Sequence, residues 1–133
     1  MKKITIILLL ISSTTIFSQT IIRYKSDYTI KYKAAQDESS DGGSIEDTIK
    51  MDVDIIHNTL EKTVEVELSE NGKNLFLFKN VKYKETFYTK NQKYTAYKAE
   101  DKQGNKYFIS FNKIVIKIDH QSKYTGFGFR LKN

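Results

Sequence analysis

A polar loop in the first third of the chain has the residue types that bind calcium. Asp37, Ser39 and Asp41 place acidic or hydroxyl oxygens at alternate positions, and Gly42 follows them. This order is typical of the first half of a calcium-binding loop. The second half departs from it, because the twelfth position is Thr48, where such loops have a bidentate Glu. We therefore interpret the segment as a solvated acidic loop and expect no metal site.

The two histidines could act as the general base of a hydrolase. His57 ends an apolar segment, and His120 lies beside Asp119 in a predicted turn. A Ser–His–Asp site also needs an activated serine, and the Gly-x-Ser-x-Gly pattern does not occur in the sequence. Nor do two histidines without a spaced carboxylate motif make a zinc site. We therefore expect no enzyme and no cofactor, with a calcium-dependent hydrolase as the least favoured alternative.

Tyrosines are the candidate ligand-binding residues. Two lie in the predicted first strand, where they would line the interior of a barrel, and three are interleaved with lysines in the second half of the chain. Aromatic rings beside lysines can bind single-stranded nucleic acid, a glycan or an anionic polymer. The same pattern fits a hairpin that packs its rings inward and guards its edge with lysines. The candidates are Tyr24, Tyr28, Tyr83, Tyr88 and Tyr94.

Most of the chain has the period-two pattern of β-strands. Apolar residues occupy the even positions from Ile22 to Tyr32, and Thr63–Leu68 alternates in the same way. Asn71-Gly72 then predicts a tight hairpin. Later strands are predicted over 75–78, 86–89, 94–99, 107–111, 114–118 and 124–131. In the last of these, Gly126 and Gly128 share one face, which indicates close backbone approach or a ring stacked over glycine.

The segment Ser44–Leu60 fits both a strand and a helix. Ile49, Met51 and Val53 alternate with charged residues, but the same segment also has a helical apolar stripe. Its many β-branched residues favour a strand. The total is eight or nine short-looped strands in an antiparallel meander. We therefore predict an all-β fold, a closed barrel or a sandwich, formed by a single domain over residues 19–133.

The first 18 residues have the order of a secretory signal peptide. Lys2 and Lys3 precede an apolar stretch over 4–17, and Ser18 suits the position before the cut. The stretch is shorter than the roughly 20 apolar residues of a membrane-spanning helix, so we expect no stable span after cleavage. The mature protein should be periplasmic or secreted and should not meet nucleic acid. Because the sequence has no cysteine, packing alone must stabilise it in an oxidising compartment.

Charge is distributed unevenly along the chain. Residues 37–70 contain eleven acids and two bases, whereas residues 71–133 contain fourteen bases and four acids. Oppositely charged surface regions are one interpretation. Pairing within the sheet is the other, for instance Glu65 and Glu67 opposite lysines across the Asn71-Gly72 turn.

These observations favour a small exported binding or interaction module without catalysis. It would bind a small apolar molecule or a glycan inside a barrel, or a partner protein on its charged faces. The alternative is an inhibitor or immunity-type protein that blocks an envelope or secreted enzyme with its acidic region.

Overall fold

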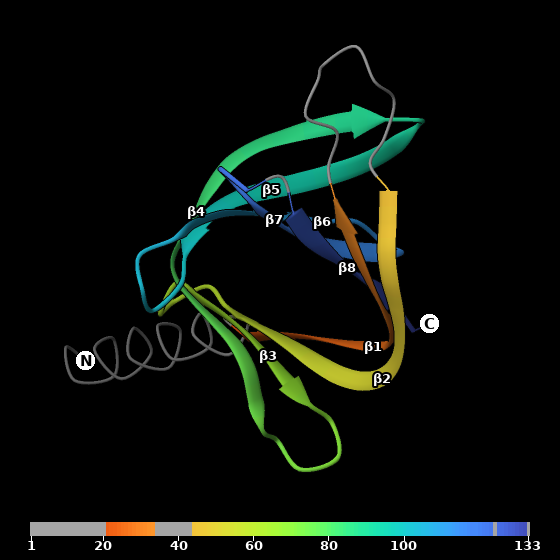
Figure 1. Ribbon diagram of the computed structural model, residues 1–133. Coiled ribbons are helices and arrows are strands. Elements are labelled where there is room, and N and C mark those ends of the chain that lie inside the picture. The colour runs from red at the N-terminus through yellow and green to blue at the C-terminus, as the bar shows by residue number, and fades with distance from the viewer. Residues whose placement is uncertain (1–20, 34–43, 124, 133) are drawn as a thin grey trace, which may run out of the picture.

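Eight β-strands follow one another in the computed structural model, which describes residues 21–33, 44–123 and 125–132 (Figure 1). The predicted signal peptide and the calcium candidates Asp37, Ser39 and Asp41 lie outside these ranges. The strands are β1 (Ile21–Lys33), β2 (Ser44–Asn58), β3 (Thr63–Leu68), β4 (Asn74–Thr89), β5 (Gln92–Glu100), β6 (Lys106–Phe111), β7 (Val115–His120) and β8 (Thr125–Leu131).

The strands form a closed antiparallel barrel. Each strand pairs with the next in the sequence, and β8 pairs with β1 to complete the circle. The predicted all-β meander is therefore confirmed, as a barrel rather than a sandwich. Closure leaves neither β1 nor β8 as a fully exposed sheet edge, which removes the usual risk of edge-to-edge association.

The ambiguous segment at 44–60 is a strand, as its β-branched residues favoured. β2 runs from Ser44 to Asn58 and pairs with β1 on one side and with β3 on the other. Val53 and Ile55 point into the barrel and have no exposed surface. Two β-branched side chains fit well on the pleated, buried face of a sheet, whereas in a helix their rotamers would be restricted.

Apolar side chains from β2 to β8 occupy the barrel interior. They include long aliphatic residues and rings that contact one another across the barrel, as expected for a small barrel whose interior is filled by side chains. The buried cluster consists of Val53, Ile55, Val64, Val66, Phe78, Val81, Ala99, Ile109, Phe111, Ile116, Ile118 and Phe129.

The predicted alternation in β1 is wrong beyond Asp27. Tyr24 and Ser26 face the interior, but the register with both neighbouring strands shifts between Ser26 and Tyr28. Thr29 is consequently buried opposite Phe129, and Tyr28 shares the outer face with Arg130. A bulge exchanges the two faces of a strand, and the order of apolar and polar residues does not reveal it.

A tyrosine ring lies over a glycine on the outer face of the barrel. Tyr32 of β1 pairs with Gly126 of β8, and a Cβ atom added at Gly126 would lie 2.8 Å from the Tyr32 ring. The Tyr32 hydroxyl donates a hydrogen bond to Asp119 of β7. Of the predicted reasons for a glycine here, the ring stacked over it is the one found at Gly126, and this contact links three strands at the seam where the barrel closes.

Candidate functional site

Five aromatic rings form a continuous cluster at one end of the barrel interior. We call Tyr24, His57, Tyr83, Tyr97 and Phe111 the aromatic cluster. His57 stacks on Phe111 with ring centroids 5.2 Å apart, and Tyr97 meets the His57 ring edge-on at 5.0 Å. Tyr24 lies 5.5 Å from Phe111, and Tyr83 lies 6.1 Å from Tyr97. The rings come from five different strands, so only the closed barrel brings them together.

The aromatic cluster runs from the barrel core to the surface. His57 is 4% exposed, whereas Tyr83 is 61% exposed. Tyr83 packs on the half-buried Tyr97, so its exposed ring is continuous with the buried rings of the cluster. The outer end of the cluster can therefore offer ring faces to a ligand without disturbing the core.

Tyrosine hydroxyl groups add polar chemistry to this apolar surface. Burial raises the pKa of Tyr24, and the nearby Tyr97 raises it further. Burial likewise raises the pKa of Tyr97, with a further contribution from Tyr83. Both groups thus stay protonated and can donate a hydrogen bond. Within the described residues, neither the Tyr24 nor the Tyr97 hydroxyl has a hydrogen-bond partner, whereas that of Tyr83 lies 3.0 Å from Thr86 Oγ1.

A hollow with a basic rim opens beside Tyr24. Its volume is about 530 Å³, and it is lined by Arg23, Tyr24, Lys25, Asn112, Lys113, Leu131 and Lys132. Lys132 is paired with Asp52 at 2.9 Å, and Lys25 lies opposite Asp54 in the β1–β2 register. Arg23 and Lys113 form no ion pair with the described residues. The rim therefore has a net positive charge that favours an anionic group on a ligand.

The structure separates the five predicted tyrosines. Tyr24 and Tyr83 join the aromatic cluster, but Tyr28 lies on the outer face beneath Arg130, 4.9 Å from its guanidinium carbon. Tyr88 stands 72% exposed near the tip of the β4–β5 hairpin. Tyr94 faces outward yet is only 7% exposed, because Phe87 stacks on it.

Sequence reasoning missed His57, Tyr97 and Phe111 as companions of Tyr24. An unbroken register counted from the hairpin turn would place Lys84 opposite Tyr97, and it is the bulge between Tyr83 and Glu85 that brings Tyr83 there. Burial lowers the pKa of His57, so its ring is neutral at neutral pH and acts as an aromatic surface.

The second histidine has a structural role. His120 Nδ1 accepts hydrogen bonds from the backbone N–H groups of Ser122 and Lys123, each at 3.1 Å, and thereby holds the β7–β8 turn. Its ring packs edge-on against Tyr107 at 4.9 Å. Across the described part of the chain, no three His, Asp or Glu side chains gather as metal ligands.

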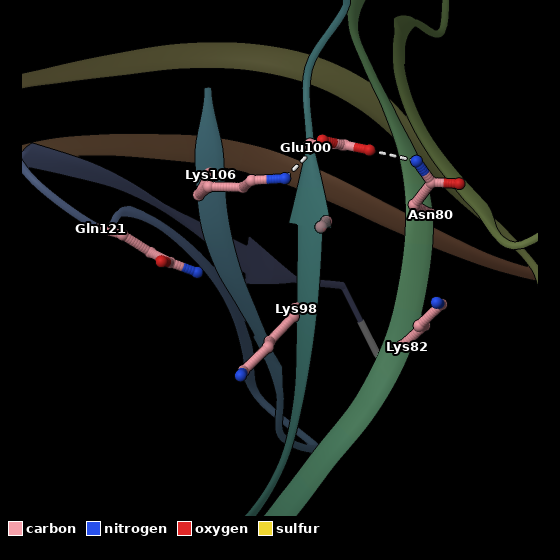
Figure 2. A pocket seen from close by; sticks show the side chains of 7 residues that line it. Asn80, Lys82, Lys98, Glu100, Lys106 and Gln121 are labelled. Atoms are coloured by element: carbon pink, nitrogen blue, oxygen red, sulfur yellow. Dashed lines mark hydrogen bonds and ion pairs between the residues drawn. The ribbon is translucent and has the colours of Figure 1, made fainter. Parts of the chain in front are cut away.

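A second hollow, of about 480 Å³, lies on the outer wall of β4, β5 and β6 (Figure 2). Its lining is mostly polar: Asn80, Lys82, Lys98, Ala99, Glu100, Lys106 and Gln121. Glu100 accepts hydrogen bonds from Lys106 Nζ at 2.6 Å and from the Asn80 amide. Figure 2 shows the side chains of Lys82 and Lys98 extending away from each other.

The outer face of β2 and β3 is acidic. Asp54 lies directly opposite Glu67, and Glu65 lies opposite Ile56. On the other side of β3, Glu65 pairs with Leu77 and Glu67 with Asn74, so the expected neutralisation by lysines across the Asn71-Gly72 turn is wrong. Like charges directly opposite each other destabilise a sheet. Lys25 lies opposite Asp54 on the β1 side, so the uncompensated negative charge of this face is that of Glu65 and Glu67.

Comparison with models of known protein families, with curated proteins and with solved structures finds no match. Among the described residues, no helix has the length and apolar character needed to cross a bilayer.

Proposed function

We propose that this protein is an exported, non-catalytic binding module that recognises an anionic, ring-bearing ligand, such as an acidic glycan. The observation that carries the proposal is the aromatic cluster, which continues from the buried His57 to the exposed Tyr83. Packed side chains occupy the barrel interior, so the ligand would bind at the open end of the cluster and not deep inside the barrel.

Each part of the site has a separate task in this proposal. The exposed face of Tyr83 would stack on the apolar face of a sugar ring. The hydroxyl groups of Tyr24 and Tyr97 would donate hydrogen bonds to sugar oxygens. Arg23 and Lys113 would attract a carboxylate, and Arg in particular can bind it through two parallel hydrogen bonds.

Calorimetric titration with a hexuronic acid oligosaccharide tests the proposal. Tyr83→Ala should weaken binding about two- to twelvefold, because one aromatic contact contributes about 0.5–1.5 kcal/mol. Tyr88→Ala is the matched control, since Tyr88 is an exposed ring of the same strand outside the aromatic cluster. Equal affinity of the wild-type protein for a neutral oligosaccharide would contradict the role of the basic rim. Equal losses in the two variants would contradict the site.

The acidic face of β2 and β3 supports a second candidate, an inhibitor that covers a basic active site. Asp54 and Glu67 stand opposite each other, a destabilising arrangement that a basic partner would relieve. A pull-down from an envelope extract should retain a partner that dissociates as salt rises and that Glu65→Gln/Glu67→Gln no longer retains. Retention that is indifferent to both salt and these substitutions would exclude this role.

A further inference from the structure

The two lysines of the outer hollow are an unfavourable pair in the free protein. Lys82 of β4 and Lys98 of β5 are direct cross-strand partners. Like charges at such positions repel and destabilise the sheet. Neither ammonium group is in an ion pair with any residue of the described chain. In Figure 2 the two side chains leave the sheet in different directions, as mutual repulsion would produce.

Glu100, the acid that lines the same hollow, does not neutralise the charges of Lys82 and Lys98. The ammonium group of Lys106 and the amide of Asn80 hold the pKa of Glu100 below its usual range, and both occupy its carboxylate. Asn80 reaches Glu100 from a backbone bulge in which it has a φ of 53°. Glu100 is therefore paired with Lys106, and the positive charges of Lys82 and Lys98 remain beside a hollow of about 480 Å³.

We infer that this hollow is a binding site for a doubly charged oxyanion group, a phosphate or a sulfate. Two unpaired ammonium groups match the charge of a dianion, and lysine binds phosphate as a mobile point charge. Gln121 supplies an amide donor at the same rim, where it makes only a long contact of 3.4 Å to the Tyr107 carbonyl oxygen. The bound anion would turn the repulsion between Lys82 and Lys98 into a shared attraction.

Thermal unfolding in potassium phosphate and in potassium chloride of equal ionic strength tests this inference. Phosphate should raise the melting temperature of the wild-type protein by about 2–4 °C more than chloride. Lys98→Glu should keep only the general stabilisation by phosphate salts and lose the rest of this difference, and it should be more stable than the wild type without phosphate because a repulsive pair becomes attractive. Lys82→Glu should behave in the same way.

Lys93→Glu is the matched control, because it makes the same change in net charge at an exposed position of the same strand. It should keep the response to phosphate, which separates site binding from the general stabilisation of proteins by phosphate salts. Equal responses in Lys98→Glu and Lys93→Glu would overturn the inference.

Two further arms identify the source of the anion. Sodium sulfate in place of phosphate tests whether any free dianion suffices. Co-sedimentation with phosphatidic acid vesicles, whose phosphomonoester headgroup can carry two charges, compared with phosphatidylcholine vesicles, tests a lipid headgroup. Sedimentation of the wild type that Lys98→Glu abolishes would assign the site to a phosphate presented on a membrane surface. Absence of a Lys98-dependent response in all three arms would overturn the site, and it would leave the aromatic cluster and its ligand unaffected.

Discussion

At the residue scale, single side chains on the outer wall of the barrel pack against one another and link neighbouring strands. Tyr32 covers Gly126 and donates its hydroxyl hydrogen bond to Asp119, so one side chain links β1, β7 and β8. Burial is the main reason why the pKa of Asp119 is raised. Lysines cover other outward rings, with Lys117 Nζ 5.5 Å from the centre of Tyr94. The barrel therefore has packed aromatic contacts on both sides of its wall.

Gly126→Ala should destabilise the protein by about 1–3 kcal/mol, because the new methyl group would lie 2.5 Å from Asp119 Oδ1 and 2.8 Å from the Tyr32 ring and would force both side chains to move. Gly128→Ala is the control, since its nearest neighbours would lie 3.8 Å and 3.9 Å from the added Cβ. Urea denaturation measures the free energy of unfolding of both variants. Equal losses of stability in the two would show that the Tyr32 contact is not the cause.

Acidification should weaken the fold through His57. Burial lowers its pKa in the folded state, so the unfolded chain, with a histidine pKa near 6.5, binds more protons. The stabilisation from the neutral ring is therefore complete above about pH 6.5 and decreases as the pH falls from there toward the folded-state pKa. His57→Phe keeps the stacked ring and should flatten this dependence in urea denaturation between pH 7.5 and 5. An unchanged slope in the variant would assign the pH dependence to other groups.

At the element scale, the turn residues of the β4–β5 hairpin set its twist, and a bulge in β4 sets which side chains face outward. Lys90 and Asn91 form a two-residue turn in which both φ angles are positive, at 49° and 63°. This is the geometry that matches the right-handed twist of hairpin strands. A register shift between Tyr83 and Glu85 then places Tyr83 on the opposite face of β4 from Phe87. As a result, Tyr83 joins the aromatic cluster while Phe87 and Tyr94 stack on the outer wall.

Asn91→Val should cost about 1–2 kcal/mol, because a β-branched residue resists the left-handed conformation. Asn91→Gly should leave stability unchanged or raise it, since glycine adopts positive φ without a steric penalty. The melting temperatures of the two variants, compared with that of the wild type, check this prediction. A tolerated valine would mean that the hairpin accepts another turn type.

At the scale of the whole molecule, the sequential pairing of eight strands ends in the contact between β1 and β8. Phe129 of β8 sits at this closure, paired with Thr29 of β1 and Ile116 of β7, and it is almost fully buried. Because the sequence has no cysteine, such packing supplies the stability that disulfide-rich domains obtain from cystines.

Phe129→Ala should therefore destabilise the protein by about 3–5 kcal/mol, a large part of the 5–15 kcal/mol typical of a domain. Denaturation followed by circular dichroism measures this loss, and Phe127→Ala, at a half-buried ring of the same strand, is the comparison. A smaller loss at Phe129 than at Phe127 would contradict its place at the centre of the closure.

The sequence by itself determined the strand content, the meander order and the hairpin positions, because alternation and turn residues act over a few neighbours along the chain. The strand at 44–58 followed from its β-branched residues in the same local way. Only the tertiary structure decided which face each residue occupies beyond a bulge, as Tyr28 shows. It also decided that Tyr24, His57 and Tyr97 meet, since closure of the barrel joins positions far apart in the chain. Bulges and closure depend on the packing of the whole barrel, which no local pattern encodes.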